Sequence, residues 1–139
     1  MARAELLVIG LDGADFNLLK EYSPPFLSSF SVKNENHHDK PRTPETWWSF
    51  YTGLTVKKHG VKSFKLDEAN KVKEPRLWEI FNANKRTVGL VNLPMTYPVR
   101  KVEGFMISGM PSPIAITKGS VEDLEKVSFC YPRELRSVL

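Results

Sequence analysis

The chain has 139 residues, 41% of them hydrophobic and 26% charged, which is the ordinary balance of a soluble globular domain with a core of its own. Its single cysteine, Cys130, excludes an internal disulfide and a cysteine-based metal cluster. The net charge is +4, but the lysines and arginines are spread along the chain without interleaved aromatic residues, so we expect no nucleic-acid partner.

The first predicted element is a strand over Leu6–Leu11, a continuous apolar run typical of buried parallel sheets. The run is too short to cross a bilayer and no signal-peptide cleavage site follows it, so we expect a cytoplasmic protein with no membrane partner. Asp12 follows this strand, at the edge where open α/β sheets bind ligands, and its carboxylate suits a divalent cation. The competing interpretation is that Asp12 caps the tight turn that Gly13 permits. Asp15 can cap a short helix after that turn.

Residues 43–52 (TPETWWSFYT) form the helix with the clearest periodicity. Thr43 is a suitable N-cap, Pro44 takes the favoured first position and Gly53 is a good stop signal. Apolar residues at positions i, i+3, i+4 and i+7 predict one buried face: Trp47, Phe50, Tyr51 and Leu54. The helix N-terminus would favour an anion such as phosphate beside the Thr43 hydroxyl, which could act as a nucleophile, although threonine is also common as a plain cap.

Later segments predict one more clear helix and two more strands. Lys62–Lys73 is charged and irregular, whereas Pro75–Asn84 is amphipathic, with inward positions at Leu77, Ile80 and Phe81. The remaining expectations are exposed loops at 31–42 and 111–116, strands at Thr87–Leu93 and Gly104–Ser108, a helical turn at 121–127 and a terminal helix at Pro132–Val138.

This order of elements predicts an α/β fold, with a small, mainly parallel sheet flanked by helices in a single domain over residues 1–139. Three strands would leave a sheet edge and a face without cover. We therefore expect an incomplete version of a larger core.

Two further groups of residues are candidates for a site. Asn92, Thr96 and Tyr97 follow the second predicted strand, at the same sheet edge as Asp12 and Gly13, where they could line a pocket or simply form the turn before Pro98. His59, in the loop after the Thr43 helix, is more often a structural or solvated residue in such a place than a metal ligand.

Six stretches resemble, in order, segments of one family: LLVIGLDGAD (6–15), TPETWWSFYTGLTVKKHGV (43–61), LWEIF (77–81), VGLVNLPMTYPV (88–99), GFMISGMPSP (104–113) and YPREL (131–135). The chain resembles the N-terminal part of the type I phosphodiesterase/nucleotide pyrophosphatase family, within the alkaline phosphatase superfamily. Members of this family are metal-dependent phosphoester hydrolases with an α/β core and two divalent metals, usually zinc, with manganese or magnesium as alternatives. The implied substrate is a small phosphoester.

The resemblance gives roles to three residues. Asp12 would be a ligand of one metal, and Thr43 would be the nucleophile that bridges to the metals and forms a phospho-enzyme intermediate. His59 would have a structural role in the loop that closes the nucleophile helix. In nucleotide pyrophosphatases a phosphate-binding Asn follows the H-G pair, and Phe64 stands in that position here.

The family's other metal ligands are downstream Asp and His residues, and after Thr43 this sequence holds only Asp67, Asp123 and His59 of these types. We therefore expect the N-terminal segment of a hydrolase, whose missing half would come from a partner chain or through self-association. The alternative is a truncated, non-catalytic module that binds a phosphorylated ligand or a protein partner. A dinucleotide-binding domain is a weaker alternative, because VIGLDGAD lacks the G-x-G-x-x-G spacing.

Overall fold

The computed structural model describes residues 5–22, 25, 29, 31, 42–110 and 128–137. By its internal contacts the chain forms two compact units, Met1–Thr43 and Pro44–Leu139. The expected loop at 111–116 and helical turn at 121–127, and nearly all of the loop at 31–42, lie outside the described residues. The single domain over residues 1–139 stays a prediction.

The first unit contains one helix, α1 (Phe16–Glu21), among its described residues. Its start is the predicted one, because the Asp15 carboxylate accepts hydrogen bonds from the backbone N–H groups of Asn17 at 2.7 Å and Leu18 at 3.0 Å.

The strand predicted at Leu6–Leu11 is wrong, because this segment has no ladder partner among the described residues and is not a strand. Its side chains are exposed, with Leu7 at 78% and Ile9 at 73%. An apolar run becomes a strand only when a neighbouring strand takes up its backbone hydrogen bonds, and composition cannot supply that neighbour.

The helix α2 (Thr43–Thr52) has the predicted bounds. It stops at Gly53, whose φ is +69° and whose N–H donates to the Ser49 carbonyl at 2.8 Å. The predicted buried face is wrong in part, because Phe50 is 48% exposed and the buried residues are Pro44, Trp48 and Tyr51. One residue along a helix turns the face by about 100°, so a shift from Trp47 to Trp48 selects a different side.

Two short helices follow that the sequence did not predict. The helix α3 (Val56–His59) ends at Gly60, whose φ is +74°. The helix α4 (Leu66–Lys71) lies inside the segment predicted to be irregular. Its Glu68 carboxylate accepts backbone hydrogen bonds from Lys62 at 2.8 Å and Ser63 at 2.9 Å, which fixes the loop that enters the helix.

The helix α5 (Leu77–Ala83) confirms the helix predicted at Pro75–Asn84. At its start the Glu79 carboxylate accepts the Arg76 backbone N–H at 2.8 Å. The residue it buries is Trp78, and the predicted inward residue Ile80 is 46% exposed.

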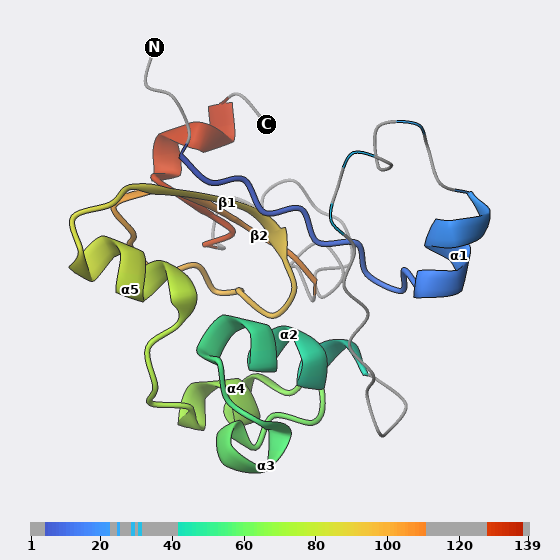
Figure 1. The fold of residues 1–139 in the computed structure, drawn as a ribbon. Helices are drawn as coiled ribbons and strands as arrows, with labels where there is room; N and C mark the ends of the chain where they lie inside the picture. The colour runs from blue at the N-terminus through green and yellow to red at the C-terminus, as the bar shows by residue number, and fades with distance from the viewer. Residues whose placement is uncertain are drawn as a thin grey trace. The chain divides into compact units, whose positions relative to one another are not determined.

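The sheet has three strands in the order β1-β2-β3 (Figure 1). Strands β1 (Val88–Leu93) and β2 (Gly104–Ser108) were predicted and pair in parallel, whereas β3 (Cys130–Tyr131) was not predicted and pairs antiparallel with β2. The α/β class is confirmed, and the sheet is mixed, with five residue pairs in the parallel ladder and two in the antiparallel one. The predicted terminal helix is a 3-10 helix, η2 (Arg133–Ser137).

The core of the second unit lies between the sheet and the helices α2, α4 and α5, which Figure 1 shows gathered on one side of β1 and β2. Its buried members are Trp48, Tyr51, Val61, Ala69, Val72, Trp78, Met95, Val102 and Met106. Among the residues that the structure describes, no helix has the length and apolar character needed to cross a membrane.

Candidate functional site

The two residues predicted to carry the chemistry are in contact. The Thr43 hydroxyl donates to the Asp12 carboxylate, with Oγ1 at 3.2 Å from Oδ1 and 3.3 Å from Oδ2, although the residues are 31 positions apart. Asp12 lies in an exposed turn with Gly13, whose φ of +71° is easily adopted only by glycine. Gly13 therefore shapes the turn that presents Asp12 to Thr43.

The arrangement orients a hydroxyl toward a base. A carboxylate that accepts the hydroxyl hydrogen bond holds the Thr43 oxygen in place and is the nearest acceptor for its proton. Thr43 also begins a helix of 10 residues, whose first turn presents free backbone N–H groups to an anion. Glu45 adds a carboxylate to the same turn and opposes an anion there.

The pair supplies part of a metal site. A carboxylate and a hydroxyl are oxygen ligands of the kind that divalent cations accept. A catalytic zinc ion takes three protein ligands, and no group of three or more His, Cys, Asp or Glu side chains able to hold a metal occurs within residues 5–22, 42–110 and 128–137. Asp12 and Thr43 alone therefore do not make a complete zinc site.

The predicted pocket residues are only partly brought together. Thr96 and Tyr97 line a pocket in the second unit, whereas Asn92 and Gly13 do not. Asn92 is exposed, with φ +57°, where the pairing of β1 and β2 is irregular. Thr96 also forms the turn, because its hydroxyl donates to the Leu93 carbonyl at 2.8 Å and accepts the Gly109 N–H at 3.3 Å. Thr96 therefore forms the turn and also lines this pocket, and its role in a functional site stays a prediction.

His59 has the contacts of a structural residue. It is buried, its Nδ1 accepts the Val61 N–H at 3.1 Å, and its Nε2 lies 3.0 Å from the Ser49 hydroxyl. Because Nδ1 is an acceptor, the neutral ring carries its proton on Nε2 and donates it to Ser49. A ring nitrogen that already bears a proton cannot activate Ser49, so the pair joins α3 to α2 and is not a nucleophile with its base.

Stability should therefore depend on pH through His59. Burial lowers the pKa of His59 below its ordinary value. A hydrogen bond to the Glu45 backbone and the negative charge of Glu45 raise the pKa, but by less. As the pH falls, the His59 ring takes up a proton in the unfolded chain before it does so in the folded chain. The free energy of unfolding should therefore be highest above about pH 6.5 and should fall as the pH drops below this value. Urea unfolding at several pH values should show this slope in the wild type. In His59→Gln the slope should be shallower, and an unchanged slope would assign it to other groups.

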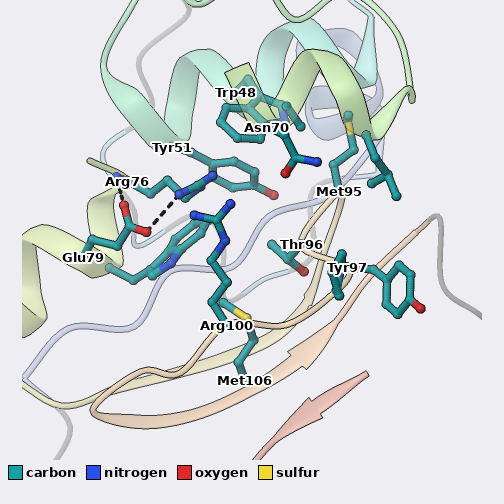
Figure 2. Close-up of a pocket in the computed structure, with 14 residues that line it drawn as sticks. Trp48, Tyr51, Asn70, Arg76, Glu79, Met95, Thr96, Tyr97, Arg100 and Met106 are labelled. Carbon is teal, nitrogen blue, oxygen red and sulfur yellow. Dashed lines mark hydrogen bonds and ion pairs between the residues drawn. The ribbon is translucent and has the colours of Figure 1, made fainter. Parts of the chain in front are cut away.

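The largest group of residues that sequence reasoning missed lines a pocket of about 70 Å³ in the second unit (Figure 2). Its walls come from α2, α4, α5, β2 and the segment between β1 and β2. Besides Thr96 and Tyr97, the lining residues that carry polar or aromatic groups are Trp48, Tyr51, Asn70, Arg76, Trp78, Glu79 and Arg100. Of the residues that line it, Thr96 and Tyr97 were predicted from the sequence as pocket candidates.

Comparison of the chain with family models, with curated proteins and with solved structures gives no match. The resemblance to the type I phosphodiesterase/nucleotide pyrophosphatase family therefore stays an expectation from the sequence.

Proposed function

We propose that this chain carries the nucleophile-bearing, N-terminal segment of a metal-dependent phosphodiesterase or phosphatase with an alkaline-phosphatase-like fold. The contact between the Thr43 hydroxyl and the Asp12 carboxylate is the observation that supports the proposal most. A small phosphoester as substrate and a cytoplasmic location belong to the same proposal.

In this mechanism Thr43 Oγ1 attacks phosphorus in line with the leaving group. The bond between Oγ1 and phosphorus forms, the bond to the leaving oxygen breaks, and the hydroxyl proton passes through Asp12, which already accepts its hydrogen bond, to the leaving oxygen. Water then attacks the phosphothreonine: its oxygen bonds to phosphorus, the bond between phosphorus and Oγ1 breaks, and one proton of the water returns to Oγ1. Asp12 and Thr43 would be two ligands of a divalent metal, which would supply positive charge to the phosphoryl oxygens. Its other ligands would come from outside this pair.

The proposal is tested by hydrolysis of a chromogenic phosphodiester with added zinc or manganese. Thr43→Ala should lower the rate by about 10³-fold or more, because it removes the attacking atom, and Thr43→Ser should retain measurable turnover. Thr52→Ala is the matched control, because its hydroxyl, at the other end of α2, donates to the Trp48 carbonyl at 2.7 Å. Equal rates in the wild type and Thr43→Ala would overturn the proposed role of Thr43.

The second candidate is a non-catalytic module that binds a phosphorylated ligand or a protein partner. It is favoured by the incomplete metal-ligand set in the described part of the chain. Absence of turnover in the wild type, together with metal binding that is unchanged in Asp12→Asn, would favour this candidate over the hydrolase.

A further inference from the structure

The pocket of the second unit is built from residues that take no part in the proposed hydrolysis. Neither Asp12 nor Thr43 lines it. Aromatic rings form much of its wall, with Tyr51 and Trp78 packed edge to face at 5.0 Å between ring centroids. The Tyr51 hydroxyl is directed to the Pro94 carbonyl at 3.0 Å, which fixes this wall to the segment after β1. The pocket therefore has a rigid, largely apolar frame.

The charged groups in this frame leave a surplus of positive charge. Arg76 is neutralised, because its guanidinium lies 2.9 Å from the Glu79 carboxylate and 5.1 Å from the centre of the Trp48 ring. Arg100 has no hydrogen bond or ion pair with any residue in the described part of the chain. Figure 2 shows its guanidinium extending into the pocket toward Tyr51. Two guanidinium groups and one carboxylate give the pocket a net positive charge.

Two further donors have no acceptor within the described residues. The Trp48 indole N–H is buried without a hydrogen bond, and Trp48 is only 1% exposed. The Asn70 side-chain amide, on an exposed residue that lines the pocket, makes no hydrogen bond there either. The Trp48 nitrogen has no accessible surface, so its N–H does not reach an ion in the pocket. The pocket thus combines the exposed, unpaired Arg100 guanidinium with the exposed Asn70 amide, and its one carboxylate, Glu79, is paired with Arg76.

We propose that this pocket binds a small oxyanion of the size of inorganic phosphate, with Arg100 as its main contact and Asn70 as a further donor. The space of about 70 Å³ holds roughly five water-sized groups, the heavy-atom count of a phosphate ion. Guanidinium groups bind phosphate oxygens through charge-assisted hydrogen bonds. The proposal does not depend on the proposed hydrolysis, because it uses none of the same residues.

Tryptophan fluorescence provides the test, because Trp48 and Trp78 line the pocket. Titration with inorganic phosphate, at an ionic strength held constant with chloride, should change the emission saturably. Arg100→Gln should weaken binding by about tenfold or more, and Asn70→Ala should weaken it less. Lys101→Gln is the matched control: it removes the same charge from the next residue, which is exposed and outside the pocket, and binding should be unchanged. A parallel titration with methyl phosphate separates a free ion from a phosphoester group as the preferred ligand.

Three results would overturn the proposal. The first is the absence of a saturable signal in the wild type. The second is an equal loss of affinity in Arg100→Gln and Lys101→Gln, which would indicate a nonspecific effect of charge. The third is binding that survives Arg100→Gln but is lost in Thr43→Ala, which would place the anion at the Asp12–Thr43 pair. Failure of the hydrolysis assay leaves this test unaffected, because binding is read without turnover.

Discussion

Replacing Trp48 with alanine is expected to lower the free energy of unfolding by about 3–5 kcal/mol. Trp48 is 1% exposed, and its ring meets the Tyr51 ring edge to face at 6.0 Å between centroids. The substitution removes this contact and the ring under the Arg76 guanidinium, and it leaves a cavity that the helices cannot fill without moving. Urea unfolding followed by circular dichroism measures the loss without depending on tryptophan emission.

Phe50→Ala on the same helix is the matched control. Phe50 is also aromatic, but it is 48% exposed, so its removal should cost about 1 kcal/mol or less. If Phe50→Ala destabilised the chain as much as Trp48→Ala, the buried face of α2 would be the one predicted from sequence spacing, and the packing described above would be wrong.

The helix α2 illustrates what can be predicted locally and what cannot. Its end was predictable, because Gly53 stops the helix with a left-handed backbone. At its start Thr43 is the first helical residue and not the predicted cap, and its hydroxyl donates to Asp12. Its buried face was not predictable, because aromatic residues occupy positions 47, 48, 50 and 51 and therefore cover more than one side of the helix. The choice between these sides is made by residues far along the chain, such as Trp78 against Tyr51.

The sheet shows the same limit for strands. Val88–Leu93 and Gly104–Ser108 were predicted from apolar runs, and they pair with each other. Leu6–Leu11 is an equally apolar run without a ladder partner among the described residues, whereas Cys130–Tyr131 is a strand although two residues carry no periodicity. Pairing is a property of two segments, so a pattern within one segment cannot establish it.

The candidate site was predictable only through the family resemblance. Asp12 and Thr43 are 31 positions apart, and each taken alone favours a plain capping role. The charged residues of the pocket in the second unit were missed because Arg76 and Arg100, like Asn70, come from separate segments, and no motif joins them. The fold brings these residues together. Ligand binding is suggested only by their shared pocket and by the side chains that have no hydrogen-bond or ion-pair partner among the described residues.

Gly104→Ala is expected to destabilise the second unit by about 3 kcal/mol or more, through strain and steric overlap. Gly104 begins β2 with φ +126°, a conformation that residues with a Cβ rarely adopt. An added Cβ would overlap the backbone carbonyl of Val88, its parallel partner on β1. The backbone cannot move aside freely, because Val88 N–H donates to the Glu103 carbonyl at 2.9 Å and the Asn82 amide also binds Glu103. Urea unfolding measures the loss, and hydrogen exchange should locate it in β1 and β2.

Gly89→Ala separates backbone strain from simple crowding in the same pair of strands. Gly89 lies opposite Phe105 in the parallel register, and a Cβ there would approach a ring atom of Phe105 at 2.6 Å. This neighbour is a side chain that is 41% exposed, so the ring can turn toward solvent and the expected cost is only about 1 kcal/mol. A cost equal to that of Gly104→Ala would mean that crowding between β1 and β2 dominates at both positions. A clear difference would assign the larger loss to the left-handed backbone at Gly104 and to its contact with a carbonyl that cannot rotate away.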